Sequence, residues 1–165
     1  WATAYTLGKA INKIGDFDLI LCGKQAIDGD TAQVGPGLAM RMDVPYLTCI
    51  QKIRSADEEK VVVERMMDDG HDVVEVNYPA LLTVVKDINE PRVPSLKGKM
   101  KAKKAAITTL SADDIDADPG CIGLPGSPTQ VVKVFPPEPR GQRAVFSGTL
   151  DEQIDQLVDR LKPYL

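Results

Sequence analysis

Residues 23–37 of the chain read Gly23-Lys24-Gln25-Ala26-Ile27-Asp28-Gly29-Asp30-Thr31-Ala32-Gln33-Val34-Gly35-Pro36-Gly37. An apolar run at residues 17–22 precedes this stretch, and residues 38–42 after it are typical of a helix. A strand, a polar loop with glycines and a helix N-terminus often bind phosphate in this order, because the first helical turn presents unpaired N–H groups. Pro36 suits the first helical position, and Gly35 and Gly37 let the backbone approach a ligand. The stretch therefore predicts a nucleotide-phosphate loop in an α/β fold.

The loop matches neither of the two best-known phosphate-binding motifs. It has neither the lysine-containing P-loop pattern nor the three spaced glycines of the Rossmann fingerprint. A plain strand-to-helix connection is also rich in turn residues. Taken by themselves, the residues of the loop leave both interpretations open.

The segment from Gly23 to Asp28 closely resembles the adenine-nucleotide loop of the electron transfer flavoprotein β subunit. The resemblance implies the following cofactor-binding residues: Gly23, Lys24, Gln25, Ala26, Ile27, Asp28, Gly29, Asp30, Thr31, Ala32, Gln33, Val34 and Gly35. Thr31 and the amides near Gly35 are expected on phosphate. Asp28 and Asp30 would repel a phosphate, so we expect them to cap the loop backbone or to bind ribose hydroxyls.

Two further segments resemble the same family, in the same order along the chain. Val63, Arg65 and the acidic turn at residues 68–70 follow the β-subunit signature, although Asp72 stands where that pattern has Glu or Gln. Residues 89–104 resemble the family's partner-recognition loop, in which a leucine at the position of Leu96 enters a pocket of a dehydrogenase. The implied partner-binding residues are Leu96, Lys97, Met100 and Lys101.

The lysines of this third segment also permit a simpler interpretation. Five of the eight residues from 97 to 104 are lysine, and a run of charge is usually a solvated surface. An exposed leucine among them favours docking, because apolar anchors carry most interface energy and surrounding cations steer an acidic partner.

The loop sequence also resembles one subgroup of the family. Simple electron carriers bind AMP in this loop, whereas electron-bifurcating members bind a second FAD there. The small residues Gly29 and Ala32 and the Val34-Gly35-Pro36 sequence resemble the bifurcating loop. The resemblance thus implies FAD, with AMP as the alternative, and a β-subunit flavin that takes a hydride from NADH. Electrons would then pass to the α-subunit flavin and to ferredoxin or flavodoxin, with an acyl-CoA dehydrogenase-type flavoprotein as a further partner.

Length and composition predict one domain with a substantial core, since 43% of the 165 residues are apolar. The net charge of −4 argues against nucleic-acid binding, and three cysteines without C-x-x-C spacing predict free thiols in a reducing compartment. We find no apolar run long enough for a membrane span and expect a cytoplasmic protein. Trp1 is not an initiator methionine, so we expect an N-terminal part of the domain to be missing.

The order of elements predicts a three-layer α/β/α fold with a mainly parallel sheet, similar to adenine nucleotide alpha hydrolases. Helices are expected at residues 3–14 and 35–42, and strands at residues 17–22, 46–53, 60–67, 73–78 and 80–85. The third and fourth strands flank Asp68-Asp69-Gly70, a hairpin signal. We expect a nucleotide-binding domain at 1–118, including the recognition loop at 88–104, and an arm and helix at 119–165 that dock on the α subunit. Thr149 and Glu152 predict a capping box at the start of the last helix.

No catalytic or metal-binding residue is predicted. The only histidine, His71, is expected at a solvated hairpin tip, which excludes a Ser/His/Asp or Cys/His arrangement. Two other functions stay open: an ATP-using adenylating enzyme and a nucleotide-sensing module of the same superfamily. The first needs a Ser-Gly-Gly-x-Asp type of loop, which these residues lack, and the recognition-loop resemblance argues against both.

Overall fold

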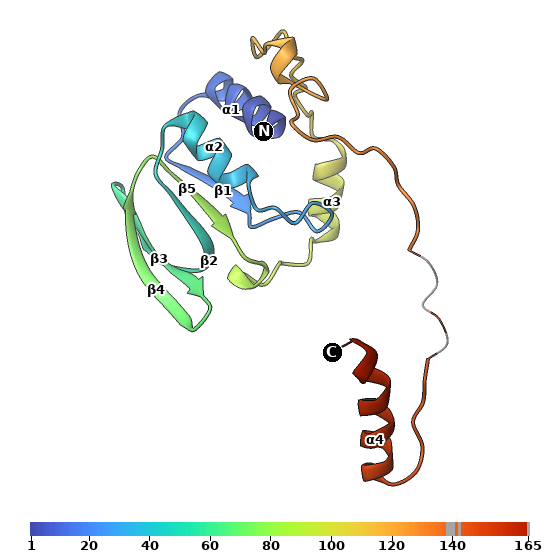
Figure 1. Cartoon of the computed structure of the whole chain (residues 1–165). Helices are drawn as coiled ribbons and strands as arrows, with labels where there is room; N and C mark the ends of the chain where they lie inside the picture. The colour runs from blue at the N-terminus through green and yellow to red at the C-terminus, as the bar shows by residue number, and fades with distance from the viewer. Residues whose placement is uncertain (138–140, 142, 165) are drawn as a thin grey trace. The chain divides into compact units, whose positions relative to one another are not determined.

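The fold was analysed in a computed structural model that describes residues 1–137, 141 and 143–164. The chain consists of two compact units, of which the first covers Trp1–Gln130 and the second begins at Val131. The first unit contains one mixed sheet of five strands in the order β1-β5-β2-β3-β4. This architecture confirms the predicted α/β class and the appended hairpin (Figure 1).

The strands of the sheet are β1 (Leu19–Gly23), β2 (Tyr46–Ala56), β3 (Lys60–Met67), β4 (Gly70–Asn77) and β5 (Ala80–Val84). β5 pairs in parallel with β1 and β2, whereas β3 pairs antiparallel with β2 and β4. Leu82 lies opposite Leu21 of β1 and Leu47 of β2 in this register. The β3–β4 hairpin turns at Asp68 and Asp69 as predicted, and His71 is exposed beside the turn.

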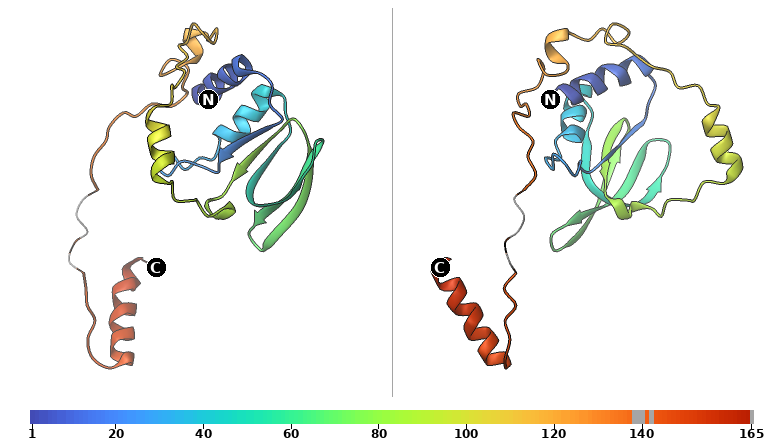
Figure 2. Two further views of the ribbon diagram at one scale, coloured as in Figure 1. Left: turned by 180° about the vertical axis from the view of Figure 1, so that it is seen from behind. Right: turned by 90° about the vertical axis from the view of Figure 1, so that its right-hand side faces the viewer.

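The core consists of two apolar clusters because β5 buries both of its faces. Leu81 packs with Leu38 and Ala39 of helix α2 (Val34–Met42) on one face of the sheet. Its neighbour Leu82 points the other way and packs in a second buried cluster, in which Ile50, Val61 and Val63 are its partners. Helix α1 (Ala2–Ile14) packs beside α2, and Figure 2 shows the two helices next to each other from two further directions.

Helix α2 begins at Val34, so the prediction of Pro36 as the first helical residue was wrong by two positions. The first intrahelical bond runs from the Gly37 N–H to the Gln33 carbonyl at 2.9 Å. A proline at the third position therefore removes no helical hydrogen bond, just as at the first.

The basic segment after β5 was expected to be an irregular loop, and this expectation was wrong for residues 96–103. A short 3-10 helix, η1 (Lys86–Ile88), is followed by helix α3 (Leu96–Lys103). The Ser95 hydroxyl accepts a hydrogen bond from the Gly98 N–H at 3.1 Å, which caps α3. Lys, Met and Ala favour helix once such a cap is present, and the local glycines do not prevent it. A second 3-10 helix, η2 (Pro119–Cys121), follows later in this unit.

The second unit contains helix α4 (Leu150–Leu161), which is followed by η3 (Lys162–Tyr164). The predicted capping box is present: the Thr149 hydroxyl accepts from the Glu152 N–H, and the Glu152 carboxylate accepts from the Thr149 N–H at 2.8 Å. The apolar side chains of α4, among them Ile154 and Leu157, are partly exposed to solvent. Docking of this unit on an α subunit stays a prediction.

One ion pair of the sheet predicts a pH effect on stability. Arg54 Nε donates to Glu64 Oε1 at 2.7 Å, and the Glu64 side chain is only 12% exposed. This hydrogen bond, aided by the charge of Lys52, holds the pKa of Glu64 below its ordinary value of 4.5. The resulting stabilisation is present above the ordinary value and is lost as the pH falls through the lowered pKa. In urea unfolding from pH 7 to pH 3, the parent should lose stability more steeply than Glu64→Gln, and parallel curves would contradict this.

Candidate functional site

The predicted nucleotide loop leaves the sheet where its parallel strands end. The Lys24 N–H donates to the Val84 carbonyl at 2.9 Å, which ties the start of the loop to the end of β5. In open α/β sheets, ligands bind at this carboxyl edge of the strands. The loop then enters α2, whose first N–H groups at Val34 and Gly35 have no helical partner. In the described part of the chain, no side chain caps this helix end. The edge therefore offers an anion both free donors and the positive end of the helix dipole.

Ten of the thirteen predicted cofactor residues line one pocket of about 340 Å³, here called the loop pocket. Lys24, Thr31 and Val34 are among them, so a cation, a hydroxyl and the helix start share one cavity. Ile27, Asp28 and Gly35 are the predicted residues that do not line it. The structure thus brings most of the predicted residues together, while their binding of a nucleotide stays a prediction.

Gly35 has a packing role that was not predicted, while its role at a ligand stays a prediction. This residue of α2 is buried, and a Cβ added to it would clash with Cγ2 of Thr83 on β5. The missing side chain allows α2 to pack closely against the sheet, which in turn fixes the helix end beside the loop.

The two loop aspartates take part in hydrogen bonds inside the loop. Asp28 Oδ1 accepts from the Gly29 N–H at 2.9 Å, and Asp30 Oδ1 accepts from the side-chain amide of Gln25. Asp30 and Ala32 adopt left-handed backbone conformations, with φ of 50° and 53°. The Asp28 bond corresponds to the expected capping of the loop backbone, whereas the partner of Asp30 is a side chain and not the backbone.

A second cavity, here called the outer pocket, adjoins the loop pocket and was not predicted. It has a volume of about 680 Å³ and shares Ala32 and Gln33 with the loop pocket. The rest of its wall comes from the start of α1, from α2 and from the segment after η2: Trp1, Ala4, Pro36, Gly37, Met40, Arg41 and Pro128. Its wall is mainly apolar, and Arg41 has the one charged side chain among the residues that line it. The sequence offered one signal for this pocket: Pro36 and Met40 are four residues apart and so lie on the same side of α2. Trp1 and Ala4 come next to them only in the folded chain.

Comparison with known proteins identifies the family. Residues 1–115 match the protein family that is described as "Electron transfer flavoprotein domain". The chain belongs to the electron transfer flavoprotein family. This membership confirms the predicted resemblance and does not favour an adenylating enzyme or a nucleotide sensor.

Curated members of the electron transfer flavoprotein family match nearly the whole chain. The electron transfer flavoprotein subunit beta of Thermoanaerobacterium thermosaccharolyticum is 44% identical over 98% of this chain and 62% of its own length. The Caffeyl-CoA reductase-Etf complex subunit CarD of Acetobacterium woodii has the same identity and shares. Protein FixA of Bradyrhizobium diazoefficiens is 40% identical over 97% of this chain and 58% of its own length. The chain thus spans about three fifths of the length of these flavoprotein relatives.

Helix α3 carries the residues that the resemblance to the electron transfer flavoprotein family implied for partner recognition. Leu96 and Met100 are one helical turn apart, and the Leu96 side chain is among the exposed apolar groups. With Lys97, Lys101 and Lys104 they line a shallow depression of about 370 Å³. The four predicted partner residues therefore lie on one exposed surface, with cations around two apolar side chains.

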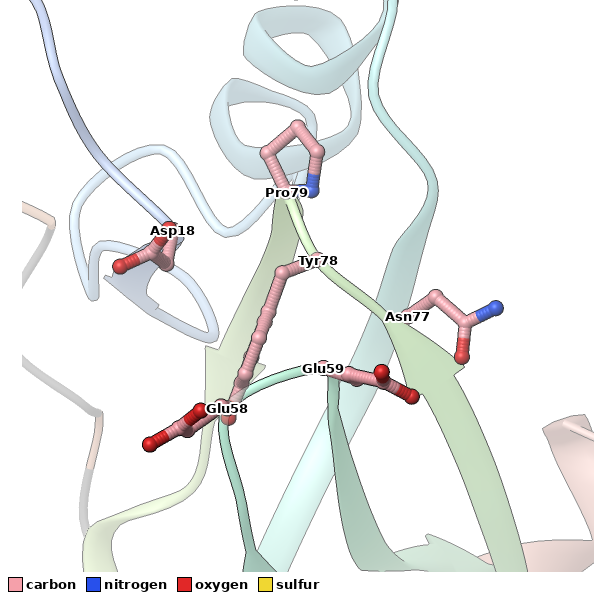
Figure 3. Close-up of a pocket in the computed structure, with 6 residues that line it drawn as sticks. All are labelled: Asp18, Glu58, Glu59, Asn77, Tyr78 and Pro79. Carbon is pink, nitrogen blue, oxygen red and sulfur yellow. The ribbon is translucent and has the colours of Figure 1, made fainter.

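A third cavity lies at the edge of the sheet opposite the predicted nucleotide loop. Figure 3 shows Asp18, Glu58 and Glu59 around it, together with Asn77, Tyr78 and Pro79. Asp18 and Pro79 directly precede β1 and β5, so this cavity is at the amino edge of the parallel strands. Its carboxylates would repel a phosphate, so this cavity does not suit a nucleotide phosphate, and binding at the carboxyl edge stays a prediction.

Three structural findings concern membrane spanning, metal binding and the Cys22 thiol in the described residues. Among residues 1–137, 141 and 143–164, no helix is both long and apolar enough to cross a membrane. The same part of the chain contains no group of three or more His, Cys, Asp or Glu side chains that is placed to hold a metal ion. Burial raises the pKa of the Cys22 thiol at the end of β1, so this thiol stays protonated near neutral pH.

Proposed function

We propose that this chain acts as the β subunit of a heterodimeric electron transfer flavoprotein and that it holds FAD at the loop and outer pockets. The relatives named as β subunits and as part of a reductase complex support the subunit assignment. The observation that carries the choice of FAD over AMP is the apolar outer pocket next to the phosphate-type loop. AMP has no group to occupy that pocket, whereas FAD has a large aromatic ring system beyond its diphosphate.

Each part of the two pockets suits one part of FAD. The N–H groups at the start of α2 and the Lys24 ammonium suit the diphosphate, and the Thr31 hydroxyl is a further donor. The apolar side chains of Ala4, Pro36 and Met40 exclude water from the ring. FAD supplies the redox chemistry when it is bound, and the chain supplies its binding and surroundings.

The proposed electron route follows from this assignment. NADH is the donor, and electrons leave toward the α-subunit flavin and toward ferredoxin or flavodoxin, by electron bifurcation. An acyl-CoA dehydrogenase-type flavoprotein is the partner of the surface on α3. A simple carrier with AMP in the loop pocket is the second outcome that the experiment below distinguishes.

The test is the nucleotide content of the β subunit purified with its α subunit. We expect two FAD per heterodimer and rapid bleaching of the flavin absorbance on anaerobic mixing with NADH. Met40→Trp should fill the outer pocket and lower the content to one FAD plus AMP, because the loop pocket is left intact. Met67→Trp is the matched control, since Met67 is also an exposed methionine but lies on β3.

The outcomes separate the alternatives. One FAD plus AMP in the parent, with no reaction with NADH, would overturn bifurcation and leave the simple carrier. Absence of any nucleotide from the β subunit would overturn the assignment of both pockets. Equal FAD loss in Met40→Trp and Met67→Trp would show that the outer pocket is not the ring site.

A further inference from the structure

Arg41 places a positive charge in the wall of the outer pocket. Its guanidinium lies 4.4 Å from the centre of the Trp1 ring and 5.1 Å from the centre of the Tyr5 ring. Tyr5 lies in the first turn of α1 and Trp1 is the N-cap residue of that helix, whereas Arg41 belongs to α2. Two cation–π contacts from a neighbouring helix hold the guanidinium in place without neutralising it.

Arg41 forms no ion pair with a carboxylate in the described part of the chain. Within residues 1–137, 141 and 143–164, no carboxylate oxygen lies within 4.0 Å of the Arg41 nitrogens, in contrast to Arg54, which pairs with Glu64. The other side chains that line the outer pocket carry no charge. A guanidinium is always protonated and is more weakly hydrated than an ammonium, so it tolerates a partly apolar wall.

A fixed cation in an apolar pocket discriminates between the charge states of a ligand. The oxidised flavin ring is neutral, whereas the reduced ring can carry a negative charge. Because the pocket wall is poorly polarisable, the attraction between Arg41 and a negative ring is stronger than it would be in water. The pocket therefore binds the reduced ring more tightly than the oxidised ring.

We propose that Arg41 is a tuning residue that raises the reduction potential of the flavin in the outer pocket by favouring its negatively charged, reduced form. This inference rests on the proposed function, because it requires FAD in the two pockets. The stacking on Trp1 and Tyr5 sets where the charge lies, so the effect depends on both helices. The ammonium of Lys9 on α1 lies outside the pocket and should not change the reduction potential comparably.

The test is a reductive titration of the FAD-loaded heterodimer, in which the second flavin serves as an internal reference. Arg41→Met should lower the ratio of affinities for reduced and oxidised FAD at least about tenfold, the smallest effect typical of a neighbouring opposite charge. For a one-electron couple this corresponds to a potential about 59 mV lower. Arg41→Lys keeps the charge and should stay within about threefold of the parent ratio.

Lys9→Met is the matched control. The Lys9 ammonium lies 6.0 Å from the centre of the Tyr5 ring but does not line the outer pocket, so its removal deletes one positive charge nearby. An unchanged ratio in Lys9→Met, with a lowered ratio in Arg41→Met, supports the proposal. An equal ratio in the parent and Arg41→Met, both with two FAD, overturns this inference alone. A parent without FAD in the β subunit overturns the proposed function as well.

Discussion

Gly35→Ala is expected to destabilise the chain by about 2 kcal/mol, although alanine is the better helix former. A single added methyl group would lie far inside contact distance of Thr83 Cγ2, so we expect a cost at the upper end of the roughly 1–3 kcal/mol typical of overpacking. The gain in helix propensity, about 1 kcal/mol, offsets only part of that cost. Thermal unfolding should show a Tm lower by roughly 5–10 °C, on the order expected for a domain of this size. Nucleotide retention should fall with it, because α2 can no longer pack at its place beside the loop.

A compensating substitution tests whether this single contact is the cause. Thr83→Ser removes Cγ2 and keeps the hydroxyl, which accepts a hydrogen bond from the Cys49 N–H at 3.2 Å. The next atoms around an added Cβ, on Leu81 and Thr83, lie at 3.7 Å, an ordinary packing distance. Gly35→Ala should therefore lower the free energy of unfolding much less in the Thr83→Ser background than in the parent. If Gly35→Ala is as destabilising in the Thr83→Ser background as in the parent, the contact with Cγ2 is not responsible.

The elements that the sequence predicts correctly are those defined by a local signal. The apolar run of β5, the turn at Asp68 and Asp69 and the capping box at Thr149 each lie within a few consecutive residues, and the structure confirms all three. The helical state of residues 96–103 was missed because the prolines before this segment, its glycine and its run of charge were interpreted as a solvated loop, and Ser95 was not recognised as a helix cap.

The candidate site likewise has one part with a local sequence signal and one part that forms only in the folded chain. The loop pocket is formed by consecutive residues, so the sequence identified most of its lining. The outer pocket joins the start of α1 to one side of α2, and no local pattern connects Trp1 with Met40. Gly35 was assigned to the ligand because glycines near phosphate loops usually approach one, whereas here the close neighbour is Thr83 of β5.

Leu96→Ala is expected to weaken electron transfer to the dehydrogenase partner by about one to two orders of magnitude. The leucine is 76% exposed at the start of α3, and its burial in a partner pocket would contribute roughly 1.5–3 kcal/mol. Alanine favours helix and the Ser95 cap is untouched, so α3 should persist in the variant. Reduction by NADH should not change, because the proposed flavin pockets lie at the loop and at α1 and α2. Stopped-flow transfer to the dehydrogenase, with NADH reduction measured separately, checks both expectations.

Leu124→Ala provides the matched control for this experiment. Leu124 is similarly exposed, at 69%, but lies outside the segment at residues 88–104. Its loss should leave transfer to the dehydrogenase at the parental rate. Substitution of Lys97 or Lys101 should act differently from Leu96→Ala, because rim charges mainly change the association rate and added salt should reproduce their effect. Transfer at the parental rate in Leu96→Ala would mean that α3 is a solvated basic helix without a docking role.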